Sequence, residues 1–125
     1  MKGTDAFYNG KIYLQSLSSM LPVLALAPLS GDTILDACAA PGSKTTQLAM
    51  MMKNEGKIVA LEQNPIRFDK LMHNCKLQDA TIVEGKKVDA KVYLDPLRLG
   101  TFDKILLDVP CSAEGRISLL NEKTY

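Results

Sequence analysis

Three short segments of the sequence carry residue types that could bind or transform a ligand, and each lies at the end of an apolar, β-branched run. The first is Asp36-Ala-Cys-Ala-Ala-Pro-Gly-Ser-Lys44, the second ends at Glu62, and the third is Asp108-Val-Pro-Cys111. Small residues and Gly42 let the backbone approach a ligand closely, and the N–H groups of a following helix would point at that ligand. The first segment therefore predicts a ligand-binding turn; a plain turn into a helix is the alternative.

The first segment does not match the glycine-rich loops that hold nucleotide phosphates. A Walker loop needs Gly-Lys, whereas Gly-Ser-Lys stands here, and no glycine lies five residues before Gly42. The dinucleotide pattern Gly-x-Gly-x-x-Gly is also missing from the sequence. The segment thus argues against an ATP or dinucleotide site.

Acidic residues also stand at the ends of the other two apolar runs. Glu62 stands at the end of its run, where a carboxylate can accept hydrogen bonds from both hydroxyls of a ribose. An acidic residue at a strand end can also simply be solvated, so the prediction of ribose binding depends on the neighbouring turn. Asp108 stands beside a proline-fixed turn and the Cys111 thiol, which makes it a candidate reaction-centre group.

The cysteines differ in what their surroundings predict. Cys111 would be nucleophilic only as a thiolate, and an inert buried thiol is the alternative. Cys75 lies on an apolar helix face and is expected in the core, whereas His73 is expected at the surface. The sequence has no Cys-x-x-Cys pair and one histidine, so we expect no metal site.

The elements that must position these segments alternate between strand and helix. Asn64 and Pro65 form a helix start, and the residues after them have an amphipathic helical spacing. Such alternation predicts an α/β fold with a parallel sheet flanked by helices, in which ligands sit at the carboxyl ends of the strands. The expected strands cover 33–38, 57–62, 80–85 and 104–109, and the expected helices cover 13–27 and begin at 45 and 65; 86–100 is expected to be mostly loop.

Two helices carry patterns that predict their packing. The helix expected over 13–27 has leucines at 14, 17, 21 and 24 on one side, and Pro22 predicts a kink or a restart. The helix that begins at Pro65 has one apolar face, formed by Phe68, Leu71, Met72 and Cys75.

Length and composition limit the class of protein. A chain of 125 residues is the size of one domain, and 46% hydrophobic with 23% charged residues is ordinary for a globular protein. Fifteen basic and fourteen acidic residues give a net charge of +1, which neither supports nor excludes RNA binding. The apolar stretch over 20–29 is too short to span a bilayer, the N-terminus lacks a signal-peptide pattern, and an odd number of cysteines indicates reduced thiols. We expect a cytoplasmic protein without a membrane partner.

Together these segments resemble the RsmB/NOP family of RNA cytosine-C5 methyltransferases, which includes the bacterial Sun/Fmu-type rRNA enzymes and the eukaryotic NOP/Sun proteins. DACAAPGSKT is similar to the family signature DxCAAPGGKT, and DVPCSAEG resembles DxPCSGxG. The Gln-x-x-Ser-Ser pattern of Gln15, Ser18 and Ser19 also resembles the segment that precedes the fold in this family. The resemblance covers nearly the whole chain, from Phe7 to about Arg116.

The resemblance implies a Rossmann-like class I methyltransferase fold that binds S-adenosylmethionine. Glu62 would hold the ribose hydroxyls, Asp89 would contact the adenine amino group, and Asp108 would lie near both cofactor and target cytosine. Arg67 matches a recurrent arginine that we interpret as structural support. The residues expected to wrap the methionine and ribose are Cys38, Ala39, Ala40, Pro41, Gly42, Ser43 and Lys44.

The implied reaction transfers a methyl group to C5 of cytosine in rRNA or tRNA. A cysteine thiolate adds at C6 of the base, hydrogen bonding at N3 by Asp108 stabilises the developing charge, and C5 then takes the methyl group. In the family the attacking cysteine lies in a Thr-Cys motif that this sequence does not contain. We therefore expect the nucleophilic cysteine on the missing C-terminal part, and we expect this chain alone to be inactive. Cys111 matches the second cysteine, which helps to release the product; in the related DNA enzymes a Pro-Cys at this position attacks.

The missing motif shapes the domain interpretation. We expect residues 1–30 to be a helical lead-in and residues 31–125 to be the cofactor-binding half of the domain, without its C-terminal strands, as a fragment or a truncated gene product. Such a chain predicts self-association through an open sheet edge. The alternative functions are a catalytically inactive module that binds cofactor or a protein, and, ranked last, an amino-group methyltransferase, whose Asn/Asp-Pro-Pro-aromatic motif is replaced here by DVPC.

Overall fold

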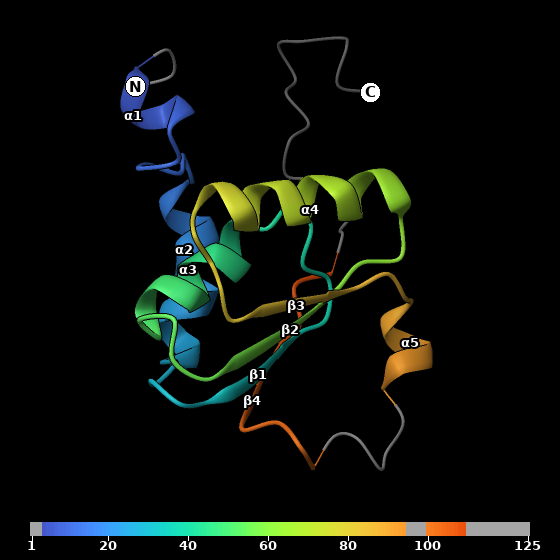
Figure 1. The fold of residues 1–125 in the computed structure, drawn as a ribbon. Helices are drawn as coiled ribbons and strands as arrows, with labels where there is room; N and C mark the ends of the chain where they lie inside the picture. The colour runs from blue at the N-terminus through green and yellow to red at the C-terminus, as the bar shows by residue number, and fades with distance from the viewer. Residues whose placement is uncertain (1–3, 95–99, 110–125) are drawn as a thin grey trace, which may run out of the picture.

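The computed structural model describes residues 4–94 and 100–109, and its centre is a parallel sheet (Figure 1). The strands are β1 (Thr33–Asp36), β2 (Lys57–Leu61), β3 (Val83–Lys86) and β4 (Lys104–Leu106). Their order is β3-β2-β1-β4, and every pairing is parallel. Ile34 of β1 lies opposite Ile58 of β2 and Lys104 of β4, so the three strands end at the same edge. The four strand predictions and the parallel sheet are confirmed, although each strand is shorter than expected.

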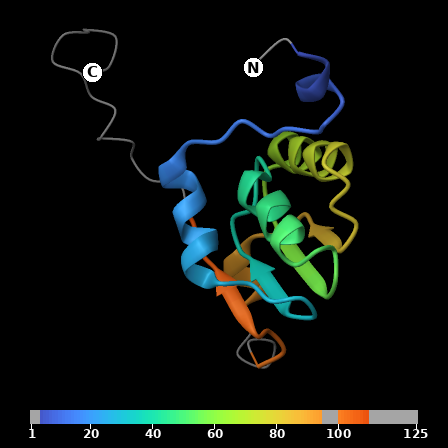
Figure 2. The same cartoon turned by 90° about the vertical axis from the view of Figure 1, so that its left-hand side faces the viewer.

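Helices cover the two faces of the sheet unequally. The helices α2 (Leu17–Leu26), α3 (Ser43–Met51) and α4 (Pro65–Leu77) lie on one face, and the short α5 (Ala90–Tyr93) lies on the other (Figure 1). Another short helix, α1 (Asp5–Tyr8), precedes them. Figure 2 shows α2 beside β4, and residues of these two elements are in contact. The sheet is therefore flanked by helices as predicted.

Two hydrophobic clusters follow from the alternation of side chains along the strands. Ile34 and Ile58 point to the face of α2, α3 and α4, where they pack with Leu48 and Leu71. Leu35, Val59 and Leu61 point to the opposite face, where Tyr93 of α5 packs against them. Because both faces of the strands are apolar, the strands appear in the sequence as continuous apolar runs.

The start of α4 is formed as the sequence predicts. The Asn64 side chain accepts a hydrogen bond from the backbone N–H of Arg67 at 3.1 Å, and Pro65 occupies the first turn. The apolar face of this helix packs against the core, with Leu71 and Cys75 fully buried. His73 is exposed, as expected.

The prediction of a helix over 13–27 is wrong in part. The helix expected over 13–27 begins only at Leu17, because the Ser16 side chain caps it by accepting from the backbone N–H of Ser19. The helix continues through Pro22 rather than restarting there, and its leucine side faces outward, with Leu17 82% exposed; Val23 is the buried residue. Residues 86–100 were expected to be mostly loop, and their described part contains the four-residue α5, which the Asp89 side chain caps.

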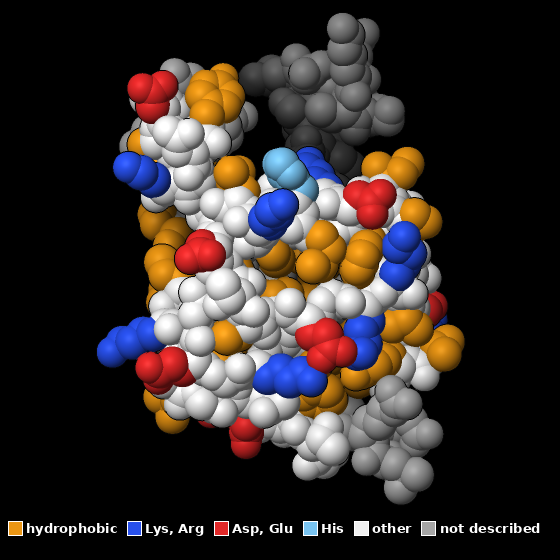
Figure 3. All heavy atoms as spheres, in the orientation of Figure 1, with side chains coloured by type: hydrophobic (Ala, Val, Ile, Leu, Met, Phe, Trp, Pro, Cys, Tyr) orange, Lys and Arg blue, Asp and Glu red, His pale blue; other side chains and the backbone are white. Residues whose placement is uncertain are grey.

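The described surface has no large region of one charge on the face seen in Figure 3. Lysine and arginine side chains lie among acidic ones there, in keeping with the net charge of +1. Within residues 4–94 and 100–109, no helix is long and apolar enough to cross a membrane.

Candidate functional site

The turn after β1 lies across the carboxyl ends of the neighbouring strands. The backbone N–H of Ala37 donates to the carbonyl of Leu106 in β4, and that of Ala39 donates to the carbonyl of Leu61 in β2, both at 2.9 Å. The turn then closes with a bond of 2.8 Å from the N–H of Gly42 to the carbonyl of Ala39. Three strands thus position the predicted ligand-binding turn.

Helix α4 holds this turn from the outside. The Arg67 guanidinium donates to the carbonyl of Ala40 at 3.0 Å, and the Asn74 amide donates to the carbonyl of Pro41 at 2.7 Å. Arg67 therefore has the supporting role that we interpreted from the sequence. Asn74 was missed, and its position seven residues after Arg67 on one helix face is the only signal in the sequence that could have indicated it.

A glycine is required where the turn enters α3. Gly42 has a φ of +102°, which favours glycine, and a Cβ atom at this position would lie 3.0 Å from the Cδ1 atom of Leu71. Gly42 is also the N-cap residue of α3, with no side chain to cover the first N–H groups. The start of α3 therefore presents its backbone donors close to the turn.

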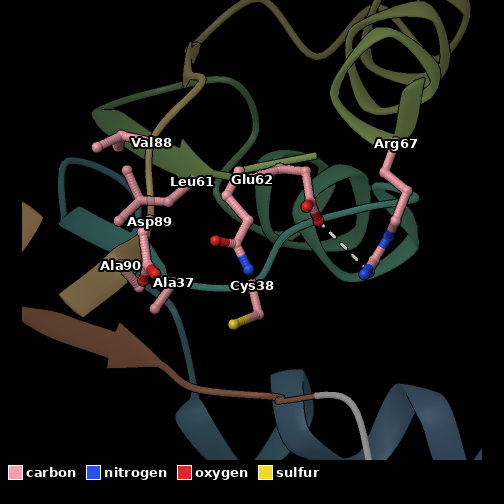
Figure 4. A pocket seen from close by; sticks show the side chains of 9 residues that line it. Ala37, Cys38, Leu61, Glu62, Arg67, Val88, Asp89 and Ala90 are labelled. Carbon is pink, nitrogen blue, oxygen red and sulfur yellow. Dashed lines mark ion pairs between the residues drawn. The ribbon is translucent and has the colours of Figure 1, made fainter. Parts of the chain in front are cut away.

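Glu62 is a buried carboxylate at the end of β2. It is only 6% exposed, and its Oε1 atom accepts from the backbone N–H of Asn64 at 2.9 Å. Its Oε2 atom lies 3.4 Å from the Arg67 guanidinium (Figure 4). A buried carboxylate needs such partners, because an unpaired charge in the interior is very costly.

Glu62 lines a cavity of about 70 Å³ between the ends of β1, β2 and the start of α5. Cys38 and Asp89 line the same cavity, and small residues such as Ala37 and Ala90 keep it open (Figure 4). Asp89 also accepts a hydrogen bond from the backbone N–H of Lys91 at 2.9 Å, so one of its oxygens caps α5. Three of the predicted cofactor residues thus meet at one cavity.

Asp36 is buried behind the turn. It is 1% exposed, and its Oδ2 atom accepts from the Thr45 hydroxyl at 2.7 Å. Burial raises the pKa of Asp36 to about 6, while the Thr45 hydrogen bond and the positive charge of Lys44 oppose that rise. Asp36 joins the end of β1 to the first turn of α3, a contact that sequence reasoning missed.

Lys44 and Asp108 form an ion pair at the edge of the site. The Lys44 ammonium lies 2.5 Å from the Oδ2 atom of Asp108, with the two side chains 15% and 49% exposed. The same ammonium donates to the Ser19 hydroxyl of α2 at 3.1 Å. Both charged residues were predicted in the site, but the pair and the role of Ser19 were not.

The described cysteines have raised pKa values. Burial is the main cause for Cys38, and the charges of Asp36 and Glu62 add to it, so this thiol stays protonated at neutral pH and suits a cavity wall better than a nucleophile. Burial raises the pKa of Cys75 to about 11, in agreement with its predicted core position. Cys111 lies outside the described residues, and no cluster of potential metal ligands is present in the described part of the chain.

The remaining residues of the first segment support the turn rather than line the cavity. Ala39 and Ala40 are buried in the hydrophobic cluster beneath it, Pro41 is exposed, and Ser43 begins α3. A parallel sheet with this turn after β1 and a buried acidic residue after β2 is the arrangement of a Rossmann-like domain that binds a nucleoside-containing ligand.

Comparison with known proteins identifies the family. The family model for 16S rRNA methyltransferase RsmB/F matches residues 23–122, so the chain belongs to this family. It is 38% identical over 123 residues to a probable ribosomal RNA small subunit methyltransferase B of Bacillus subtilis, covering 98% of the chain and 28% of that protein. It is 40% identical over 121 residues to a tRNA (cytosine(72)-C(5))-methyltransferase of Pyrococcus horikoshii, covering 95% of the chain and 30% of that protein.

Solved structures have the same fold. The crystal structure of NSun6 from Pyrococcus horikoshii with SFG matches with a TM-score of 0.80 and 38% identity, over 89% of this chain and 28% of that one. A SAM-dependent O-methyltransferase from Thermotoga maritima matches with a TM-score of 0.56 and 23% identity, over 68% of this chain and 33% of that one, which shows the fold alone. The Rossmann-like methyltransferase fold is confirmed, and the chain spans less than a third of the length of the two curated relatives described above.

Proposed function

We propose that this chain forms the cofactor-binding half of an S-adenosylmethionine-dependent methyltransferase that acts on C5 of cytosine in rRNA or tRNA. The observation that carries the proposal is the buried Glu62 carboxylate, which is held by Arg67 and opens onto a cavity that Asp89 also lines. Two carboxylates at one small cavity suit a ligand with several hydrogen-bond donors. The names of the relatives supply the class of the substrate.

The residues present fit the cofactor. Its ribose hydroxyls are donors that match Glu62, and its adenine amino group is a donor that matches Asp89. The sulfur atom of S-adenosylmethionine is positively charged, and the acidic groups at this end of the sheet would attract it. When bound, the cofactor supplies an electrophilic methyl group. The turn from Cys38 to Lys44 would lie along its ribose and methionine parts.

The reaction itself would take place beside Asp108. This residue follows β4 at the same edge of the sheet as Glu62, and Lys44 holds one of its oxygens. When it carries its proton, the Asp108 carboxyl group could donate a hydrogen bond to N3 of the target base and stabilise the negative charge that develops on the ring. Cys111 follows Asp108 by three residues. We propose that this cysteine assists product release, and an attacking role is the alternative.

A second candidate function is a non-catalytic module that binds the cofactor or a protein. Catalysis as proposed needs a thiolate, and the described cysteines have raised pKa values. Methyl transfer to a cytosine-containing RNA by this chain joined to the C-terminal part of a family member, which supplies the attacking cysteine, distinguishes the two functions. A binding module would take up the cofactor without transfer. An RNA substrate and free thiols fit a cytoplasmic location.

Cofactor titration by calorimetry tests the proposal directly. We expect saturable binding of S-adenosylmethionine by the parent chain and at least about a hundredfold weaker binding by Glu62→Ala, because a buried charged acceptor is lost. Glu55→Ala removes an exposed glutamate far from the cavity and serves as the matched control with parent affinity. Equal affinity of all three proteins, or no binding by a folded parent chain, would contradict the assignment.

We further propose that copies of the chain associate through β4. This strand is at the edge of the described sheet, and Leu107, which follows it, is 62% exposed. Exposed apolar edge strands are templates for pairing with another chain. In sedimentation velocity, the mass of the parent should rise with concentration, whereas Leu107→Lys should stay monomeric. Ile66→Lys changes an exposed aliphatic residue on α4 and serves as the control, which should behave like the parent. A parent that stays monomeric at every concentration would refute the association.

A further inference from the structure

Two residues of the N-terminal segment reach into the candidate reaction centre from outside the sheet. Ser19 of α2 accepts a hydrogen bond from the Lys44 ammonium at 3.1 Å, and the same ammonium pairs with Asp108. We propose that Ser19, supported by Gln15, is a positioning residue that holds Lys44 against Asp108. The inference rests on the proposed function, because it takes Asp108 as the group that meets the target base.

Lys44 needs such a support because its side chain is long and flexible. A lysine ammonium on a four-carbon stem is a mobile point charge unless fixed acceptors surround it. Here the stem starts in the first turn of α3, while the two acceptors come from α2 and from the segment after β4. Three elements therefore meet at one ammonium group, and Ser19 provides the neutral acceptor.

The Ser19 hydroxyl is itself held in place. The side-chain amide of Gln15 donates to the Ser19 hydroxyl and to the side-chain oxygen Oε1 of Gln47, each at 3.3 Å. The amide of Gln47, a residue buried on α3, donates to the backbone carbonyl of Met20 at 3.2 Å. Through these bonds Gln47 of α3 holds both Gln15, just before α2, and Met20 within α2. They therefore fix the position of Ser19 on α2 relative to Lys44 on α3.

The arrangement has a consequence for the carboxylate. Lys44 contacts the Oδ2 atom of Asp108, so the Oδ1 atom is the one that we expect to meet the target base. Since Asp108 is half exposed, its rotation would be much less restricted without the ammonium. Oriented charge that need not reorganise during the reaction is the main source of electrostatic catalysis. Loss of Ser19 should therefore slow methyl transfer without weakening cofactor binding.

The sequence offers a matched control next to Ser19. Ser18 is exposed, and its hydroxyl contacts the Ser16 hydroxyl at 3.2 Å rather than Lys44. Ser18→Ala thus removes a hydroxyl from the same helix turn without touching the ammonium. Ser19→Thr keeps a hydroxyl at the critical position and should restore what Ser19→Ala loses.

The first measurement is single-turnover methyl transfer to a cytosine-containing RNA by this chain joined to the C-terminal part of a family member, which supplies the attacking cysteine. The affinity for S-adenosylmethionine is measured alongside. We expect Ser19→Ala to transfer about tenfold more slowly at unchanged cofactor affinity, and Gln15→Leu to lose less. Ser18→Ala and Ser19→Thr should resemble the parent. A Ser19→Ala rate equal to that of Ser18→Ala would overturn the inference.

The second measurement does not depend on methyl transfer. Asp36 is surrounded by the Thr45 hydroxyl, the Lys44 ammonium, the Asp108 carboxylate, the Cys38 backbone N–H and the Cys75 thiol, and Lys44 lowers its pKa. Carbon-13 NMR titration of the Asp36 carboxyl should show a higher pKa in Ser19→Ala than in Ser18→Ala, because a released ammonium spends less time nearby. Equal values in the two variants would overturn the positioning role. If the joined protein with the parent sequence transfers no methyl group, that result counts against the proposed function alone, because the titration of Asp36 still tests the contact between Ser19 and Lys44.

Discussion

Acidic side chains stand at both ends of the sheet, and the two ends treat them in opposite ways. At the amino end, Asp32 accepts from the Lys104 ammonium at 2.6 Å and from the Leu29 backbone N–H at 2.8 Å. These hydrogen bonds, with that of Lys104 the larger cause, lower the pKa of Asp32. At the carboxyl end, burial raises the pKa of Asp36 to about 6. Ionisation is therefore favoured at Asp32 and disfavoured at Asp36, although the two residues are of the same type and only four positions apart.

The difference shows which end of the sheet is built for stability and which for binding. The pair of Asp32 and Lys104 joins the start of β1 to the start of β4, and Asp103 adds a hydrogen bond of 2.7 Å from the backbone N–H of Thr33. At the carboxyl end Glu62 pairs with Arg67 and Asp108 pairs with Lys44, whereas Asp36 is buried with the Thr45 hydroxyl as a hydrogen-bond partner. A buried carboxyl group with a raised pKa, such as Asp36, is typical of functional sites.

The largest expected effect comes from Asp36 and tests this difference through pH. The pKa of Asp36 is about 6 in the folded chain and ordinarily 3.8, so between pH 4 and pH 6 the folded state binds more protons than the unfolded state. The free energy of unfolding should therefore fall by about 3 kcal/mol as the pH rises through this window, and then stay level with respect to this group. Urea titrations from pH 4 to pH 7 measure it.

Asp36→Asn should remove that contribution, because the amide does not ionise. Thr45→Val provides a control in the opposite direction, since it deletes the hydrogen bond that lowers the pKa of Asp36, and the loss of stability with rising pH should become larger. If Asp36→Asn shows the same pH dependence as the parent, the raised pKa is wrong, and the contrast between the two ends of the sheet is lost.

The parts of the fold with local signals were predicted well from the sequence. Asn64 and Pro65 form a cap and a first turn from adjacent residues, and continuous apolar runs identify strands that are buried on both faces. The start of α2 was misplaced because Leu14 fits the helical spacing, while the Ser16 side chain sets the boundary. The short α5 was missed because a single turn has no periodicity to detect.

The candidate site was predicted as a set of residues but not as a set of contacts. Glu62, Cys38 and Asp89 meet at one cavity because parallel strands place their carboxyl ends together, which topology alone indicates. The bond from Asn74 to the carbonyl of Pro41 joins residues 33 positions apart, and that from Lys44 to Ser19 joins residues 25 apart. Such contacts depend on how helices pack, which spacing in one sequence does not encode.

The smallest expected effect lies at the amino end and sharpens the comparison from the other side. Lys104→Met keeps the stem of the side chain but removes the charge that pairs with Asp32, together with a hydrogen bond of 2.9 Å to the carbonyl of Ala27. Partly exposed ion pairs contribute little, so the thermal midpoint at pH 7 should fall by only a few degrees. Calorimetric scans measure it.

The pH dependence of that fall identifies its cause. Because the pKa of Asp32 is lowered in the folded chain, its stabilisation is present at neutral pH and is lost as the pH falls below the ordinary value of 3.8. The difference between parent and Lys104→Met should therefore shrink in acid, whereas the contribution of Asp36 favours acid. The affinity for S-adenosylmethionine should be the same in both proteins, because Lys104 lies at the opposite end of the strands from Glu62. A marked loss of affinity in Lys104→Met would mean that the two ends are coupled, and that the division between a stabilising end and a binding end does not hold.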